Sequence, residues 1–321
     1  MPSDPKILLL GASGYIGGTV LVDLLKEYKP LDITALVRDE TKKSILQPFG
    51  INIVEGNVEN PSLLRQLAES YDVVLNFAVP FGGGDDSIQA LVDGLEKRAA
   101  SAAVKPVLLH TSGTGSVMYG SNGETGTDVW RDSDHERWES LPDTAVARAA
   151  ARGTISAYIV MSPTVYGQGT GPGNRLSLQI PAYVRYAKRT GQAAYIGKGE
   201  NIWGHVHVQD LSGLYLVLLK HSLSSPAATK ASPESHGWSN LIYAGLDQHT
   251  WGPIITLVGD RLHARGDIPN PGARRLDDGQ GDMYMFGTNS FMPVSQKAKA
   301  LGWKQTQPGL VEAIKIALPV D

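Results

Sequence analysis

The sequence contains no cysteine among its 321 residues. Disulfide bonds, thiolate nucleophiles and cysteine-ligated zinc are therefore excluded, and the composition agrees with a reducing compartment. Long apolar runs are also absent, because a stretch such as LYLVLL at 214–219 is far shorter than the ~20 residues that span a bilayer. We therefore expect a cytoplasmic protein that has no membrane partner.

A large excess of charge of one sign is absent as well. The 29 Lys and Arg residues nearly balance the 32 Asp and Glu residues, which gives a net charge of −3, and no long basic run occurs. Binding to nucleic acid therefore has no electrostatic support, and we expect no such partner. Hydrophobic residues at 42% and charged residues at 19% are typical of a globular protein with a sizeable core.

Short β-like runs alternate with amphipathic helical segments through the first half of the chain. Each run is almost continuously apolar, as expected for strands of a parallel sheet that helices cover on both faces. The pattern predicts an α/β fold, a Rossmann-type doubly wound parallel sheet with a smaller C-terminal substrate lobe. The predicted strands are 6–10, 32–37, 51–56, 72–78, 106–112 and 157–163.

The domain boundaries follow from a change of composition near residue 167, where the glycine-rich stretch GQGTGPGN begins. Glycine, proline and polar clusters of this kind mark loops between structural units. We predict a dinucleotide-binding domain over 1–167, to which the chain returns at about 205–221 and 239–246. The substrate lobe is expected to contain 168–204 and 247–321.

The stretch LLLGASGYIGGTVLVDLL at 8–25 places three glycines between a buried strand and a helix. One glycine permits the tight turn, the second lets backbone amides approach a pyrophosphate, and the third lets the helix pack closely on the strand. The alternative is an ordinary strand-to-helix turn that happens to contain glycines. We predict a dinucleotide site in which the cofactor contacts Gly11, Ser13, Gly14, Tyr15, Ile16 and Gly17.

The end of the second strand, ALVRDE, bears on the choice of dinucleotide. An acid at this position would accept hydrogen bonds from a free ribose 2′-hydroxyl, whereas an arginine would pair with a 2′-phosphate. Arg38 occupies the position, Asp39 follows it, and Lys42 and Lys43 are close behind. We predict NADP(H) as the preferred cofactor, with NAD(H) as the alternative if Arg38 is only a solvated charge and Asp39 reaches the ribose.

Further motifs follow the glycine loop in a fixed order along nearly the whole chain: GNVEN, NFA, HTSG, PTVYGQG, WGHVHVQDLSGLY and PVSQKAKALGWKQTQPGLVEAI. With them the chain resembles the extended short-chain dehydrogenase/reductase superfamily, and is most similar to its atypical, NmrA-like and epimerase-like branch. The resemblance implies a nicotinamide cofactor. It also implies that the cofactor lies against Asn57, Val58, Phe77, Ala78, Val79, Thr111, Pro163, Thr164 and Val165.

One part of the family pattern is missing. In the family a tyrosine, with a lysine four residues later, handles the substrate proton, because nearby positive charge lowers the pKa of the phenol. None of the twelve tyrosines here has a lysine at that spacing. Residues 147–151 occupy the helix that normally carries the pair, and only Arg148 and Arg152 keep positive charge there. The ordinary alcohol-dehydrogenation mechanism is therefore in doubt.

The resemblance leaves Ser112 as the predicted catalytic hydroxyl that orients a substrate, with Thr114 or Ser116 as alternatives. The alternative is that Ser112 is a hydroxyl at the end of a strand that only makes hydrogen bonds to backbone groups. A replacement acid could come from Tyr119, His135, Tyr166 or His207. The residues predicted to line the substrate pocket are Tyr119, Tyr166, Gln179 and Trp203.

No metal site is expected. His205 and His207 share one face of a strand, but two histidines without nearby carboxylates are a weak indication of a metal. The resemblance gives His207 a structural role.

The sequence therefore favours an NADPH-dependent reductase of a small or medium carbonyl-type substrate, with a homodimer left open as its assembly. Two other functions remain open. One is a nonredox isomerase or cyclase on the same scaffold. The other is an NmrA-like regulator that senses NAD(P) without turning it over, which the missing tyrosine favours.

Overall fold

A computed structural model describes residues 5–28, 32–78, 85–138, 143–224, 237–279 and 285–320. Its centre is a sheet of seven parallel strands in the order β11-β7-β5-β4-β1-β2-β3. The six strands predicted from the sequence are all present. The strands are β1 (Lys6–Leu10), β2 (Asp32–Val37), β3 (Asn52–Glu55), β4 (Val73–Asn76), β5 (Val107–Gly113), β7 (Ser156–Ser162) and β11 (Leu241–Tyr243).

The apolar runs form strands because both faces of the sheet are covered by helices. Along β1, Ile7 and Leu9 belong to one buried cluster, and Leu8 and Leu10 belong to the other. Side chains of successive strand residues point to opposite faces, so a strand buried on both sides needs an unbroken apolar run. The predicted Rossmann-type α/β fold is therefore confirmed.

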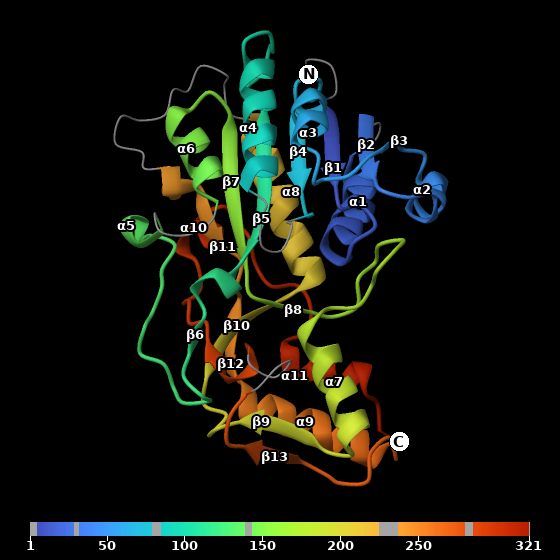
Figure 1. Ribbon diagram of the computed structural model, residues 1–321, viewed down its shortest axis with the longest axis vertical. Coiled ribbons are helices and arrows are strands. Elements are labelled where there is room, and N and C mark those ends of the chain that lie inside the picture. The colour runs from blue at the N-terminus through green and yellow to red at the C-terminus, as the bar shows by residue number, and fades with distance from the viewer. Residues whose placement is uncertain are drawn as a thin grey trace.

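Each face of the sheet has its own set of helices. The first cluster is completed by α1 (Tyr15–Glu27) and α8 (Val208–Ser224), which pack on each other. The second cluster is completed by α3 (Pro61–Ala68), α4 (Asp85–Ala99) and α6 (Thr144–Arg152). Figure 1 shows these layers above a smaller lobe. The remaining helices near the sheet are α2 (Glu40–Leu46), α5 (His135–Trp138), α10 (Gln296–Ala300), η1 (Gln47–Phe49), η2 (Thr114–Val117) and η3 (Gly237–Asn240).

The smaller lobe has a separate core of aromatic and aliphatic side chains. Its three-stranded sheet consists of β8 (Thr164–Tyr166), β10 (Ile202–His207) and β12 (Asp247–Thr250). Two pairs of strands join it: β9 (Ala193–Ile196) with β13 (Ala273–Leu276), and β6 (Tyr119–Gly120) with β14 (Thr288–Asn289). Its helices are α7 (Gln179–Thr190), α9 (Trp251–Ala264) and α11 (Leu310–Ala317).

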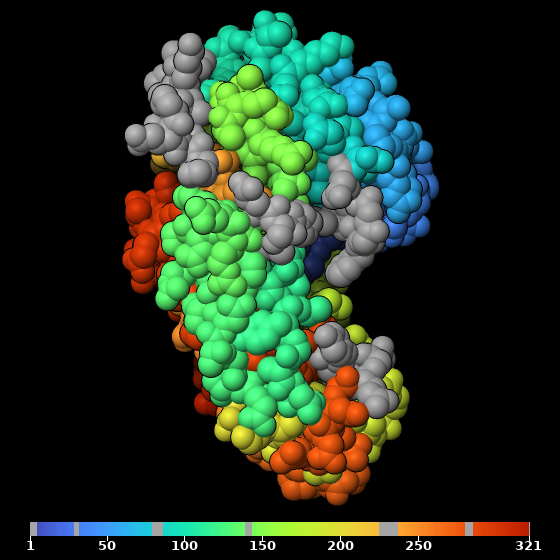
Figure 2. Space-filling view, turned by 60° about the vertical axis from the view of Figure 1, so that its left-hand side comes forward, coloured from blue at the N-terminus to red at the C-terminus, as the bar shows by residue number. Residues whose placement is uncertain are grey.

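The chain passes between the two parts at places that differ in detail from the expected boundaries. β10 does not join the large sheet, because β11 pairs with β7 and takes the edge position, while β10 pairs with β8 and β12. The segment around Gly123, expected in the nucleotide-binding domain, lies against the lobe: its N–H donates to Gly287 O and its carbonyl accepts from Glu200 N. In Figure 2 this green segment runs down over the lobe.

None of the described helices combines the length and the apolar character that a membrane span needs.

Candidate nucleotide site and Ser112 network

The glycine turn after β1 has a geometry that only glycine can adopt easily. Gly11 has φ +86°, in the left-handed region, and its carbonyl accepts a hydrogen bond of 2.8 Å from Gly14 N. A Cβ on Gly17 would overlap the Gly11 carbonyl oxygen. A Cβ on Gly11 would lie 3.1 Å from the carbonyl carbon of Phe77. The turn is therefore compact, and helix α1 packs directly on the strand that precedes it.

The start of α1 is open to an anion. Its N-cap residue, Gly14, has no side chain to accept a hydrogen bond, and the first turn contains no acidic residue. The first N–H groups of a helix have no partner within the helix, and they carry its positive dipole end. A diphosphate fits such a position, because its oxygens accept hydrogen bonds from these amides. Gly11, Ser13, Gly14, Tyr15, Ile16 and Gly17 are the residues that would hold it.

A second glycine-rich loop, residues 167–175, lies against this turn. Gly167 O accepts a hydrogen bond of 2.6 Å from the Tyr15 hydroxyl, and Asn174 N donates one of 2.9 Å to Ser13 O. A Cβ on Gly173 would overlap Ser13 O. The loop that leads into the lobe therefore packs against the glycine turn. Burial of the Tyr15 side chain raises its pKa.

The residues after β2 have distinct roles. Asp39 is the N-cap of α2, where its Oδ1 accepts a hydrogen bond of 2.9 Å from Lys42 N. The side chain of Arg38 is 75% exposed, with its Nε 3.7 Å from Asp39 Oδ2. The carboxylate is thus already engaged by the helix, whereas the guanidinium extends into solvent.

Parallel strands bring their carboxyl ends to one edge of the sheet. Because β1, β4, β5 and β7 are neighbours in the order of strands, this edge gathers Gly11, Phe77, Ser112 and Pro163 from four distant parts of the chain. Thr164 and Val165 follow in β8. Figure 2 shows the molecule narrowing between its larger upper part and the lobe, and dark-blue atoms from the N-terminal part of the described chain are visible just above this level.

Several residues predicted at the cofactor already have internal partners. The Thr111 hydroxyl lies 2.6 Å from the Tyr215 hydroxyl, and Tyr215 packs edge-on against Phe77. The Asn57 side chain binds Glu59 in its own turn, and Val58 O accepts a hydrogen bond from Ser87. Ala78 N donates to Asn76 Oδ1. Val79 lies outside the described residues, and contact of the others with a cofactor stays a prediction.

Beside this edge, Ser112 belongs to a chain of buried polar side chains. Its hydroxyl donates a hydrogen bond of 2.6 Å to Asp143 Oδ2. Asp143 Oδ1 lies 2.9 Å from Nε2 of His110, and His110 Nδ1 lies 3.0 Å from Nδ2 of Asn76. The exposed fractions of Asn76, His110 and Asp143 are 3%, 0% and 5%. Ser112 is half-buried.

The side chain of Asp143 is turned away from the helix that it precedes. Asp143 is the N-cap of α6, but its carboxylate makes no capping hydrogen bond, and its φ is +76°. Aspartate at an N-cap usually accepts a hydrogen bond from a backbone N–H of its own helix. Here the carboxylate instead contacts Ser112 and His110. Burial alone would raise the pKa of Asp143, but the hydrogen bond and electrostatic attraction of His110 and the hydrogen bond of Ser112 hold it below its ordinary value.

The sequence profile of the NAD dependent epimerase/dehydratase family matches residues 7–229. The chain belongs to this family. Curated relatives over nearly its whole length include an oxidase, ucsJ, of Acremonium sp., which is 26% identical over 337 residues covering 97% of this chain and 96% of that protein. An uncharacterized protein of Saccharomyces cerevisiae is 26% identical over 329 residues, with coverage of 97% and 98%.

Solved structures of the extended short-chain dehydrogenase/reductase superfamily have the same fold. The dTDP-glucose 4,6-dehydratase DesIV of Streptomyces venezuelae, with NAD bound, has a TM-score of 0.67 at 16% identity, over 97% of this chain and 96% of that chain. UDP-glucose 4-epimerase of Thermotoga maritima, with UDP-glucose, has a TM-score of 0.64 at 17% identity, over 98% and 97%. The resemblance to the extended superfamily and to its epimerase-like branch, inferred from the motifs, is therefore confirmed.

In this member of the epimerase/dehydratase family, the candidate replacement acids Tyr166, His207 and Tyr119 already make hydrogen bonds within the protein. The Tyr166 hydroxyl donates to Pro308 O, and burial raises the pKa of Tyr166. His207 Nδ1 accepts from Gln209 N, and burial lowers the pKa of His207. The Tyr119 hydroxyl accepts from Asp128 N. His135 begins α5.

Two residues expected to line a substrate pocket are packed in the lobe core. Trp203 is 3% exposed, and its indole N–H donates to Thr288 O. Tyr166 is also 3% exposed. Both belong to the buried cluster of the lobe, because strands β8 and β10 turn these side chains inward, so the structure gives them core packing rather than an open wall. Gln179, at the start of α7, is buried, and Tyr119 is half-buried.

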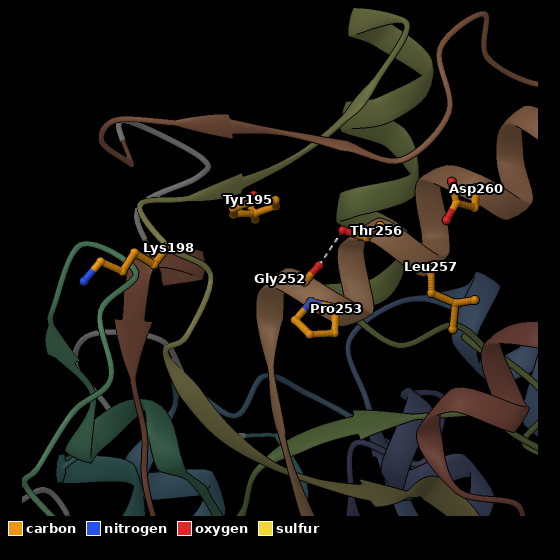
Figure 3. A pocket seen from close by; sticks show the side chains of 7 residues that line it. All are labelled: Tyr195, Lys198, Gly252, Pro253, Thr256, Leu257 and Asp260. Carbon is orange, nitrogen blue, oxygen red and sulfur yellow. Dashed lines mark hydrogen bonds between the residues drawn. The ribbon is translucent and has the colours of Figure 1, made fainter.

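A surface hollow of the lobe lies between β9 and α9 (Figure 3). Its floor includes the first turns of α9, where the Thr256 hydroxyl donates to Gly252 O. It contains no residue of the glycine turn or of the Ser112 network, so we assign no chemistry to it. The lining residues are Tyr195, Lys198, Gly252, Pro253, Thr256, Leu257 and Asp260.

The described residues contain no group of three or more His, Asp or Glu side chains that could hold a metal ion. His205 Nδ1 instead lies 3.2 Å from His249 Nδ1, so the histidine face expected on β10 is used for a buried contact within the lobe.

The sequence by itself does not indicate that Asp143 and His110 interact with Ser112. In the sequence, Asp143 is an acid before a helical segment, which indicates a cap. His110 lies in an apolar strand and has no neighbour in the sequence that points to a partner.

Proposed function

We propose that this chain is a nicotinamide-dinucleotide-dependent oxidoreductase that prefers NADP(H) and acts on the alcohol or carbonyl group of a small or medium organic molecule. The observation that carries the proposal is the uncapped start of α1 at the sheet edge where the Ser112 hydroxyl lies. The family gives further support, as do the bound NAD of DesIV and the oxidase among the relatives.

The preference for NADP(H) rests on the two residues after β2. Asp39 already accepts the Lys42 N–H, so its carboxylate is less available to a ribose hydroxyl, whereas the guanidinium of Arg38 is 75% exposed, lies 3.7 Å from Asp39 and could pair with a 2′-phosphate. The neighbouring structures contain NAD. This chain would therefore differ from them at the ribose.

Each part of the site would bind a different part of the cofactor or the substrate. The amides of the first turn of α1 would bind the diphosphate, and Phe77 and Ala78 would lie beneath the adenosine half. Pro163 and Val165 would lie beside the nicotinamide. When bound, the cofactor supplies hydride chemistry, and Ser112 would bind the substrate oxygen.

Isothermal titration calorimetry with NADP⁺, NADPH, NAD⁺ and NADH tests the proposal. We expect binding, with NADPH at least about tenfold tighter than NADH because a 2′-phosphate gains a charged partner. No heat with any of the four would refute it.

The missing Tyr-x-x-x-Lys pair favours a second function, a regulator that senses NAD(P) without turnover. Such a protein would bind oxidised and reduced cofactor equally and would oxidise NADPH with no member of a carbonyl panel. An enzyme would instead show substrate-dependent oxidation of NADPH at 340 nm.

A further inference from the structure

Helix α6 has the place in the fold where the family resemblance puts the tyrosine and the lysine. Its sequence, TAVARAAAR, contains neither residue. Immediately before it, Asp143 brings a carboxylate to Ser112, the hydroxyl predicted to face the substrate. A proton-handling group of a different chemical type is therefore present at the start of the same helix.

The directions of the hydrogen bonds in this network can be assigned from one backbone group. Ala78 N donates to the Asn76 side chain, so the accepting atom is Oδ1 and the amide nitrogen faces His110 Nδ1. His110 Nδ1 therefore accepts, and its Nε2 carries the proton that is donated to Asp143 Oδ1. This leaves Asp143 Oδ2 to accept from Ser112.

Ser112 is the member of the network with access to a ligand. Asn76, His110 and Asp143 are buried, whereas Ser112 is half-buried at the carboxyl end of β5. Because its proton is directed at Asp143, the lone pairs of the Ser112 oxygen are available to accept a proton from a substrate hydroxyl.

We propose that Ser112 contacts the reacting oxygen of the substrate and that Asp143, acting through Ser112, is the terminal proton acceptor in place of the missing tyrosine and lysine. The inference rests on the proposed function. Ser112 is then a catalytic residue. Asp143 is a positioning residue that also takes up the proton, and His110 orients its carboxylate.

The step balances as an alcohol oxidation. The substrate C–H bond would break, and its electron pair would leave with the hydrogen as hydride, for which a bound oxidised nicotinamide would be the acceptor. The substrate O–H proton passes to Ser112 Oγ as the Ser112 proton passes to Asp143 Oδ2, and the carbonyl forms. In reduction each transfer runs in reverse, so Asp143 must first take up a proton against its lowered pKa, and reduction should slow as the pH rises.

The variant that tests Asp143 is Asp143→Asn. Asparagine has the same shape and tolerates positive φ, so the backbone at +76° is kept while the acidic oxygen is removed. Ser112→Ala removes the intermediate hydroxyl. Ser101→Ala is the matched control, because the exposed Ser101 hydroxyl donates to Arg98 O, outside the network.

The first measurement needs no cofactor. Aspartate labelled with ¹³C at the side-chain carboxyl is titrated by NMR, and the Asp143 signal is identified by its loss in Asp143→Asn. Ser112→Ala should raise the midpoint of that signal, because a hydrogen bond to the ionised form is lost, and Ser101→Ala should leave it unchanged. Among described residues the titratable group that interacts with Asp143 is His110, on β5, so the titration is repeated in His110→Gln. An unchanged midpoint in Ser112→Ala would overturn the proposal.

The second measurement uses the complete protein with NADPH and 9,10-phenanthrenequinone as a carbonyl probe. Asp143→Asn should bind NADPH as the wild type does but reduce the probe roughly 100-fold more slowly or worse, as for loss of a proton donor. Wild-type turnover in Asp143→Asn would also overturn the proposal. If the wild type binds no dinucleotide, the proposed function fails, and the titration still decides whether Ser112 and Asp143 act as a pair.

Discussion

Asp39 Oδ1 accepts a hydrogen bond of 2.9 Å from the backbone N–H of Lys42, so the acid that follows β2 is the cap of α2. Its neighbour Arg38 remains exposed. We therefore expect Arg38→Ala to weaken NADPH binding by roughly tenfold or more while leaving NADH binding unchanged. Calorimetry with both cofactors checks this, and Arg65→Ala, in an exposed ion pair on α3, is the control. An equal change for the two cofactors would remove the 2′-phosphate argument.

The loop over the nucleotide turn should be sensitive to a single methyl group. A Cβ on Gly173 would overlap Ser13 O, so we expect Gly173→Ala to lower the free energy of unfolding by about 1–3 kcal/mol and to weaken cofactor binding. Gly213→Ala, in α8, is the control, because nothing lies within 4 Å of its Cβ position. That change should raise stability by about 0.5–1 kcal/mol through helix propensity. Urea unfolding and calorimetry measure both effects, and equal behaviour of the two variants would contradict the role of the loop.

The buried histidine pair predicts a loss of stability in mild acid. Burial lowers the pKa of His205 from 6.5 to about 4, and it lowers the pKa of His249 as well. Between pH 6.5 and about pH 4, an unfolded chain carries a proton on His205 and the folded protein does not. The folded state is therefore stabilised above pH 6.5, and this stabilisation is lost as the pH falls toward 4. His205 alone should account for about 3 kcal/mol.

Urea midpoints at half-unit pH steps test this prediction. His205→Gln should flatten the pH dependence, and the surface variant His263→Gln should retain it. A wild-type stability that stays constant across this range would show that His205 is protonated in the folded state.

Asp210 should be important for joining the C-terminal segment to α8. It is 2% exposed, and its carboxylate accepts from Thr306 N, Thr306 Oγ1 and Gln307 N. Asp210→Asn replaces one accepting oxygen with an NH₂ group that faces these donors, so we expect a loss of about 2–3 kcal/mol. Chemical unfolding measures it, with the exposed Glu312→Gln as a control that should change stability by less than about 0.5 kcal/mol. A loss no larger than that of the control would mean that the segment is held by packing alone.

Much of the fold was predictable because its determinants are local. The unbroken apolar runs indicated strands buried on both faces, and Val20, Leu21 and Leu24 of α1 lie in the core as their helical spacing predicts. The place of β10 was not predictable, since an apolar strand carries no information about which sheet it joins. The same limit applies to Trp203, whose size suits a pocket wall and a core equally well.

The candidate site likewise has one part that could be predicted from the sequence and one part that could not. The sequence alone determined the glycine turn, because a positive φ at Gly11 and the close approach at Gly17 are steric demands that glycine meets within a few residues. Tertiary structure alone decided that Asp143 turns from its own helix toward Ser112 and His110, and that loop 167–175 holds Ser13. These contacts join residues far apart in the chain, and their energy depends on burial and distance, which have no local signature in the sequence.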